Sequence, residues 1–534
     1  MKHIISSWSI FIVCTLMSLG LNSCGDSFLN IAPVTADDLN GYFQNEEQIF
    51  KALVAAYDPL QWTDYYGGYN QLWFMSDLRS DDIFVGGDLG SYTFHHQMQR
   101  FTMEPIDSPR SLWECLYTGV SRCNTVIDKM PNVKGITDTN KERYLAEAHF
   151  LRAYYYHWLW KFWGNIPYYS SILQPPYTVR QLPADSVYVR IMQDLDYACG
   201  KTAAGADRLM NGRPAETEWG RVTIWAALML KARVILYQND EDRLEEVYND
   251  MTRIKSSALF MLTRDYASIW LNESEFITEP TMMNKSESIW EINHKSQGGS
   301  WSWPQGGEGT IFPKFIGING LENDPDYQAG WGFETVRPEI YNQFEEGDQR
   351  RDASIINFEL RKQLLQDSLG VEITYTPRAE DTGLFNAKYA PRKGYNDISY
   401  DPELNFNNNV RVFRYSECLL NLAEVAVRKG WAKAAQTNLD LVRTRAFNKE
   451  EYGKTSPHYV TVSLDAILQE RRLEFVCEGM RFWDLVRTGH TELLTETNEN
   501  WSRVWDNNWR LLPIPSLEID RTEGEYKLVQ NPGY

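Results

Sequence analysis

Apolar residues recur every three or four positions along much of the chain, which is the spacing of an amphipathic helix. This pattern predicts helices over residues 45–60, 111–130, 140–163, 184–198 and 221–238, and again over residues 411–428, 431–445 and 464–486. Proline and glycine residues such as Pro131, Gly164 and Pro183 fall between these segments, where they end helices. The chain is therefore predicted to be mainly α-helical.

One segment, RYSECLLNLAEVAVRKGWAKAAQTNLDLVRTRA, indicates how these helices pair. Two helical stretches are interrupted at Gly430, and small side chains would let them approach closely, namely Ala423, Ala426, Ala434 and Ala435. This is the pattern of a tetratricopeptide-like hairpin, a unit that stacks with its neighbours to bury one continuous face. A strict period of roughly 34 residues is not kept, so we predict a tetratricopeptide-like scaffold without a regular repeat.

The character of the sequence changes between about residues 265 and 410. Gly, Asn, Pro and aromatic residues become frequent there, as in HKSQGGSWSWPQGGEGT and YAPRKGYNDISYDPELNFNNN. Long irregular segments in a large domain are usually functional or disordered, and the high Trp and Tyr content argues against disorder. We therefore predict an irregular, loop-rich insertion with short strands and short helices, set against the helical scaffold.

The first residues, MKHIISSWSIFIVCTLMSLGLNSCGDS, have the features of an export signal. An apolar run from Ile4 to Leu21 follows one lysine, and small residues precede Cys24. This pattern favours a lipoprotein signal over residues 1–23, after which Cys24 becomes the lipidated first residue of the mature chain. A membrane span and an ordinary secretory signal are the two alternatives. A lipidated Cys24 would anchor the protein to a membrane without spanning it.

Charge and cysteine content narrow the possible partners. The formal net charge is −19, which argues against nucleic acid and against a basic membrane-docking patch. Five cysteines lie beyond Cys24, dispersed through apolar segments, and an odd number so placed does not predict a disulfide framework. We expect most of them to be small buried side chains.

The stretch ILQERRLEFVCEGMRFWDLVRTG, at residues 467–489, is the strongest candidate for acid–base chemistry. On a helix Glu470, Glu474 and Glu478 would share one face. The neighbouring arginines would keep these carboxylates ionised, whereas a general acid needs a raised pKa. The apolar residues around them predict a packed core helix, so we interpret the stretch as structural.

Other catalytic and metal-binding patterns are missing or incomplete. The sequence contains no HExxH, CxxC, GxSxG or P-loop motif. The adjacent pair His95-His96 cannot face one metal from a helix. Asp324 and Asp326 lack the rest of a calcium loop, so a turn at Pro325 is the better interpretation. The sequence predicts no enzyme activity, no cofactor and no metal site.

Several segments, in order along nearly the whole chain, resemble the SusD/RagB-like outer-membrane nutrient-binding lipoproteins. They are CGDSFLNIAP, ERYLAEAHFLRAYYYHWLWKFWGNIPYY, WGRVTIWAALMLKARVILY, RPEIYNQFEEGDQRRDASI, RYSECLLNLAEVAVRKG, LQERRLEFVCEGMRFWDLVRTG and the closing LLPIPSLEI and LVQNPGY. The departures are small. Leu21-Asn22-Ser23 is a loose lipobox, and the acidic export signal that often follows the cysteine is reduced to Asp26.

The resemblance implies a SusD-like fold over residues 24–534. Its parts would be a tetratricopeptide-like scaffold over about 40–265 and 411–490, the irregular ligand-binding insertion over about 265–410, and a C-terminal wrap over 491–534. It also implies a lipid anchor in the outer membrane and exposure at the surface of a Gram-negative cell. The implied partners are an oligosaccharide or polysaccharide and a SusC-like TonB-dependent transporter, to which the ligand is delivered without catalysis.

Sugar sites combine aromatic faces with a few fixed polar groups, and two segments have that composition. The family tends to bind ligands through the same two regions, the early loop after the first helix and the mid-chain irregular segment. The candidate ligand contacts are Trp62, Tyr65, Tyr66, Tyr69, Asp81 and Asp82 in the early segment, Trp301 and Trp303 in SWSWPQGGEG, and Trp331. Trp301 and Trp303 alternate with serine, so a strand would place both rings on one side.

Two other functions remain open at the level of sequence. A scaffold of helical hairpins could bind mainly protein, or a nutrient other than a glycan, such as peptides. A lipid-anchored glycoside hydrolase is the least favoured alternative. The sequence does not specify which polysaccharide is bound.

Overall fold

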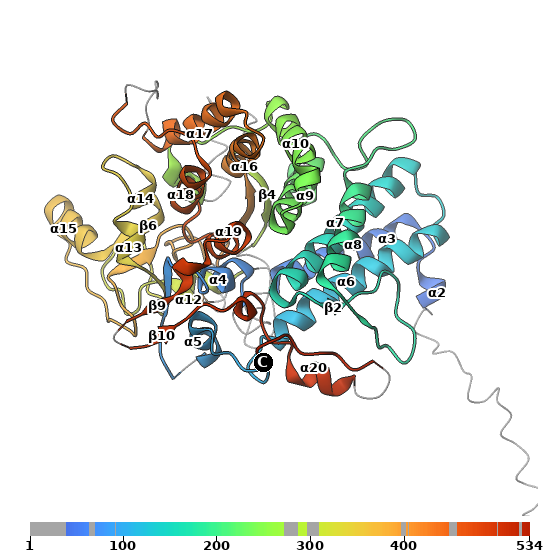
Figure 1. The fold of residues 1–534 in the computed structure, drawn as a ribbon, viewed down its shortest axis with the longest axis horizontal. Coiled ribbons are helices and arrows are strands. Elements are labelled where there is room, and N and C mark those ends of the chain that lie inside the picture. Colours follow the sequence, from blue (N-terminus) through green and yellow to red (C-terminus); the bar gives the residue numbers. More distant parts are fainter. Residues whose placement is uncertain are drawn as a thin grey trace, which may run out of the picture.

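The computed structural model describes residues 39–62, 70–90, 92–271, 287–295, 309–396, 402–403, 405–447, 456–498, 500–522 and 526–534. Figure 1 shows α3 and α6 to α8 at one end of the molecule and the short elements from α13 to α15 at the opposite end, with α16 to α19 between them. The predicted fold class, a mainly helical scaffold with an irregular insertion, is confirmed.

The scaffold helices pack as a series of neighbouring pairs. They are α3 (Glu46–Tyr57), α6 (Arg110–Lys129), α7 (Asp138–Trp163), α8 (Ala184–Ala198), α9 (Ile224–Gln238), α10 (Leu244–Ser256), α16 (Tyr415–Arg428), α17 (Ala432–Ala446) and α18 (Leu464–Glu474). Each helix from α6 to α10 packs on the next, and α10 then packs directly on α16. The helical stack is therefore continuous from α10 to α16, although the mid-chain insertion separates these two helices in the sequence.

Local signals explain where the central helix α7 begins and ends. The side chain of Thr137 accepts a hydrogen bond from the Asn140 amide at the start, and Gly164 ends the helix at a φ of +68°. Nearly every residue from Ala146 to Trp163 is buried. A helix that is apolar on all sides lies inside the protein, and α7 is accordingly covered by α6 and α8.

The predicted helices are confirmed to within a few residues, with two exceptions. Residues 411–414 are not helical: they belong to β8 (Val410–Arg414), which pairs antiparallel with β4 (Ser288–Ile292). The helix predicted over residues 464–486 is interrupted between α18 and α19 (Arg481–Thr488). Cys477 and Gly479 adopt positive φ angles of 63° and 73° there, which an α-helix cannot accommodate.

Short elements fill the mid-chain insertion. A four-stranded antiparallel sheet has the order β1 (Ile83–Gly86), β5 (Phe333–Val336), β7 (Leu384–Asn386) and β6 (Ile355–Asn357). The helices of this region are α12 (Phe312–Ile316), α13 (Pro338–Tyr341), α14 (Arg350–Ser354) and α15 (Phe358–Leu369). Because β1 lies between the scaffold helices α3 and α6 in the chain, the sheet joins the early segment to the insertion.

Smaller elements precede, connect and follow the scaffold helices. They are α2 (Leu39–Tyr42), α4 (Leu72–Asp77), α5 (Thr93–Arg100), β2 (Ile166–Pro167), β3 (Gln181–Leu182), β9 (Glu496–Thr497), β10 (Ser502–Arg503) and α20 (Ser516–Arg521). After α19 the chain returns to the first helices, where the Leu512 amide donates to the Phe162 carbonyl at 2.7 Å. Among the described residues, no helix is both long and apolar enough to cross a membrane.

Candidate functional site

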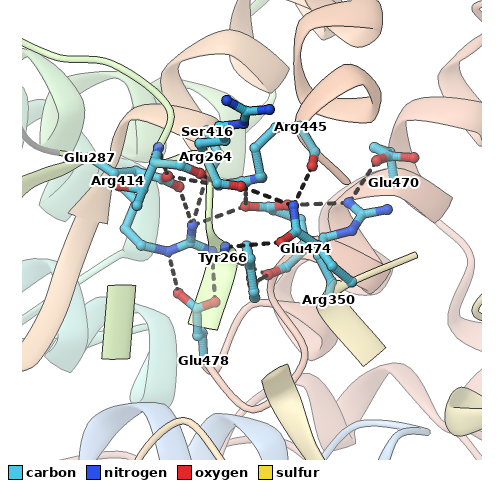
Figure 2. A network of polar contacts seen from close by, with 12 residues as sticks. Arg264, Tyr266, Glu287, Arg350, Arg414, Ser416, Arg445, Glu470, Glu474 and Glu478 are labelled. Atoms are coloured by element: carbon cyan, nitrogen blue, oxygen red, sulfur yellow. Dashed lines mark hydrogen bonds and ion pairs between the residues drawn. The ribbon is translucent and has the colours of Figure 1, made fainter. Parts of the chain in front are cut away.

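The charged stretch at residues 467–489 forms a buried ionic network. Figure 2 shows its carboxylates and guanidinium groups, those of Glu287, Glu470, Glu474, Glu478, Arg350, Arg414 and Arg445. Glu474 is fully buried and contacts Arg445 at 2.5 Å and Arg414 at 2.9 Å. Burial by itself raises the pKa of Glu474, but these arginines outweigh it and hold the pKa well below its usual range. An ionised, enclosed carboxylate cannot serve as a general acid.

The arginines that pair with these carboxylates come from elements outside residues 467–489. Arg350, Arg414 and Arg445 lie on α14, β8 and α17, whereas the neighbouring Arg471 pairs with Asp484 at 2.8 Å. Burial thus supports the predicted structural role. The expectation that arginines of the same stretch hold Glu470, Glu474 and Glu478 is wrong, although Arg471 and Asp484 do pair within it. Pairing across four elements ties the insertion to the scaffold.

Two other carboxyls have raised pKa values and are also enclosed. Burial raises the pKa of both Asp77 and Glu334 well above the usual range. Their side chains are buried at 1% and 0% exposure, so a polysaccharide cannot reach them. Neither group is placed to act as the acid of a hydrolase.

The predicted ligand contacts Asp81 and Asp82 form ion pairs with arginines of α18 and α19. Asp82 contacts Arg472 of α18 at 2.6 Å, and Asp81 contacts Arg481 of α19 at 2.8 Å. Asp82 is only 1% exposed. Both carboxylates therefore hold the early segment against α18 and α19.

Trp62 is the one aromatic candidate of the early segment that the structure describes. It follows a short 3-10 helix, Asp58–Gln61, and is half-buried. The guanidinium of Arg122 lies 4.6 Å from the centre of its ring. Tyr65, Tyr66 and Tyr69 lie outside the described residues.

The two aromatic segments start from adjoining points of the scaffold. Gln61 Nε2, next to Trp62, donates to the carbonyl of Asn293 at 2.6 Å. Asn293 follows directly on β4, and Trp301 and Trp303 come a few residues later, outside the described residues. Residues separated by more than two hundred positions are thereby joined, and we call this contact the junction.

A small recess of about 100 Å³ adjoins the junction at Asn293. Trp219 and Arg213 line it from the loop before α9, together with Trp290 of β4. The indole of Trp290 donates to the Gly220 carbonyl at 2.9 Å, whereas Trp219 is 41% exposed. Trp219 was not predicted from the sequence as a ligand contact. The loop NGRPAETEWG is the signal that could have revealed it, because a tryptophan in such a polar loop is hard to bury.

Two further residues considered from the sequence, Trp331 and Asp324, contact neighbouring groups of the protein. Trp331 is half-buried, with its ring 6.0 Å from that of Phe315 in the core between the sheet and α12. Asp324 accepts hydrogen bonds from the Asp326 and Tyr327 amides, as expected of a turn at Pro325. Within the described parts of the chain, no group of three His, Cys, Asp or Glu side chains could hold a metal ion.

Comparisons with known proteins agree on one family. The profile described as "SusD family" matches residues 286–534, and that described as "Starch-binding associating with outer membrane" matches residues 36–236. Surface glycan-binding protein A from Bacteroides fluxus is 41% identical, with a TM-score of 0.80 over 92% of this chain and 100% of its own.

Two further solved structures have named ligands. Surface glycan-binding protein A from Bacteroides thetaiotaomicron, in complex with laminarihexaose, is 37% identical, with a TM-score of 0.81 over 91% of this chain and 100% of its own. A laminarin binding SusD-like protein is 29% identical, with a TM-score of 0.77 over 92% of this chain and 100% of its own.

Proposed function

The chain belongs to the SusD family, and on that premise we propose that it is a glycan-binding protein that holds an oligosaccharide or polysaccharide at the cell surface without cleaving it. The observation that carries the proposal is the similarity to the laminarihexaose complex, which extends over 91% of the chain at 37% identity. A second relative is named for laminarin. Laminarin and laminarihexaose are therefore the first ligands to test.

We place the ligand at the junction. Trp62 stands beside Gln61 on one side, and Trp219 stands in the recess beside Asn293 on the other. Sugars present C–H faces that pack on aromatic rings, with hydroxyl groups at their edges for polar side chains. Tyr65, Tyr66, Tyr69, Trp301 and Trp303 belong to the segments that start at these points, and we propose them as further contacts.

Replacing Trp301 and Trp303 together by alanine tests this site. Aromatic contacts are worth about 1 kcal/mol each beyond the area that they bury, so laminarihexaose should bind about tenfold more weakly or worse. Titration calorimetry and affinity electrophoresis in laminarin gels measure the change. The melting temperature should stay close to that of the wild type if the rings contact ligand.

Trp431→Ala is the control, because Trp431 is 39% exposed and packs on Tyr248 of α10, in a different part of the scaffold. Its laminarin affinity should equal that of the wild type. Unchanged affinity in the double variant would remove Trp301 and Trp303 from the site. A large fall in melting temperature would show that their rings belong to the core.

We further propose that Cys24 carries the lipid anchor and that the ligand passes to a SusC-like transporter in the outer membrane. Cys24→Ala should move the protein from the membrane fraction to the soluble fraction of cells. Copurification of a large outer-membrane barrel tests the partner. Copurification without affinity for any glycan would instead favour a protein-binding scaffold, and release of sugars from laminarin would favour a hydrolase.

A further inference from the structure

A groove of about 880 Å³ lies on the side of α6 next to the junction. One wall is α6 itself, a second is the loop between β2 and β3, and the third is the C-terminal segment around α20. Ligand pockets in proteins typically have volumes of about 300–1,000 Å³, so the groove is large enough for a small-molecule ligand. None of its lining residues was predicted from the sequence as a ligand contact.

Aromatic side chains line one side of the groove. Tyr117 of α6 and Tyr169 lie nearly parallel, at an interplanar angle of 10° with 6.0 Å between ring centres. Trp113 adjoins Tyr117 at 4.9 Å. The hydroxyl of Tyr117 donates to the Pro167 carbonyl at 2.7 Å, which fixes its ring. Both tyrosines are only half-buried, so this part of the groove offers aromatic surface to a ligand.

The loop wall adds an exposed ring and an unsatisfied hydroxyl. Tyr177 is 65% exposed and has a φ of +62°, a conformation that is strained for any residue but glycine. Strained residues of this kind cluster at binding sites. The neighbouring Thr178 Oγ1 is buried, yet it has no hydrogen-bond partner among the described residues. The exposed ring of Tyr177 is therefore the group that this wall offers to a ligand.

The charges of the groove favour an uncharged ligand. Its charged lining residues are Glu114, Arg122, Glu518 and Arg521, two of each sign. Arg521 contacts Glu518 at 2.9 Å and Glu114 at 3.4 Å, and Arg122 contacts Asp58 at 2.7 Å. Each charge is therefore already balanced within the protein, and no surplus is left to recognise an acidic or basic ligand.

We infer that this groove is a second saccharide-binding surface, for a neutral polysaccharide chain. The ligand class rests on the proposed function, and the groove itself rests on the half-buried rings of Tyr117 and Tyr169, the exposed ring of Tyr177 and the balanced charges. Arg122 lines the groove and also lies 4.6 Å from the ring of Trp62, so the groove adjoins the junction. One long chain can thus occupy both, and linked binding raises affinity for the polymer above that of either surface.

The test uses the purified protein, laminarihexaose as the short probe and laminarin as the polymer. We expect the Trp301→Ala and Trp303→Ala double variant to keep weak affinity for laminarihexaose, and the addition of Tyr177→Ala to lower that residual affinity at least fivefold. Tyr177→Phe, which keeps the ring, should stay within twofold. In the otherwise wild-type protein, Tyr177→Ala should weaken retention by laminarin at least threefold. Because Tyr177 is exposed, these variants should fold normally.

The outcomes separate the two proposals. If the wild type binds laminarin but Tyr177→Ala changes neither the residual affinity nor the retention, the groove is not a saccharide surface and the proposed function stands. The groove is equally excluded if Tyr177→Ala instead abolishes copurification of a protein partner while leaving laminarin binding intact. If the wild type binds neither probe, the proposed function fails for this ligand and the groove proposal fails with it.

Discussion

Glu474 is the residue on which the buried network depends most. Its carboxylate contacts Arg350, Arg414 and Arg445, and all four side chains are enclosed. Glu474→Ala leaves three buried guanidinium groups without this partner, and breaking a buried ion pair costs about 3–5 kcal/mol. We expect a loss of this size in the free energy of unfolding, measured with urea at pH 7.

A surface ion pair provides the control for that measurement. Glu47 contacts Lys51 at 2.6 Å, but both side chains are exposed, so Glu47→Ala should barely move the urea midpoint. Laminarin affinity should be preserved in the folded fraction of both variants. A Glu474→Ala protein with the wild-type midpoint would show that the network does not support the fold.

Gly479 is a second residue that determines the local structure, because it has no side chain. Its φ is +73°, and a Cβ atom there would lie 2.5 Å from Trp73 Cα. Gly430, between α16 and α17, has a nearly identical φ of +75° but open space around it. Gly430→Ala should therefore cost only the strain of the left-handed region, about 1–2 kcal/mol.

Gly479→Ala should cost about 1–3 kcal/mol more than Gly430→Ala, because α4 and the turn after α18 must also separate. Urea unfolding of the two variants side by side gives the difference. Equal losses would mean that the close approach of Trp73 contributes nothing to stability.

At the scale of elements, Asp484 joins α18 to α19. It contacts Arg471 of α18 and Arg487 of its own helix, both at 2.8 Å. Burial alone would raise its pKa, but the two arginines outweigh burial and lower the pKa from 3.8 to about 2. Since the folded pKa lies below the unfolded one, the carboxylate stabilises the fold above pH 3.8, and this contribution is lost as the pH falls to about 2.

The expected contribution of Asp484 above pH 4 is on the order of 2 kcal/mol. Urea unfolding of the wild type and of Asp484→Asn at a series of pH values from 7 to 2 isolates it from the other carboxylates. The two curves should lie furthest apart near neutral pH and converge toward pH 2. Parallel curves over the whole range would exclude an ionic role for Asp484.

The helices were predictable because their periodicity and their stop signals are local. Residues 411–414 and the break after α18 were not, because β8 requires β4 as its partner and Gly479 requires the backbone of Trp73. The same holds for the site. Composition identified the two aromatic segments, but the contact between Gln61 and Asn293, the recess with Trp219 and the groove under Tyr177 depend on residues far apart in the chain.

At the scale of the whole molecule, two contacts between segments far apart in the sequence organise the scaffold. The packing of α10 on α16 makes the helical stack continuous although the insertion separates these helices in the sequence. The C-terminal segment then returns to α6 and α7 and forms one wall of the groove. The stability of the last residues and the shape of the groove are thereby linked.

Asn531 is the residue that fastens this return. Its side-chain amide donates to the carbonyls of Leu512 at 2.7 Å and of Trp163 at 3.0 Å, and it is 3% exposed. Asn531→Ala leaves both carbonyls buried without this donor, at a cost of about 1–3 kcal/mol for each unsatisfied group. Urea unfolding should show the loss, and limited proteolysis should release the segment from α20 onward before the scaffold is cut. Val529→Ala, at a side chain that is 70% exposed, should show neither effect. Cleavage of the scaffold first would mean that the C-terminal wrap is held independently of Asn531.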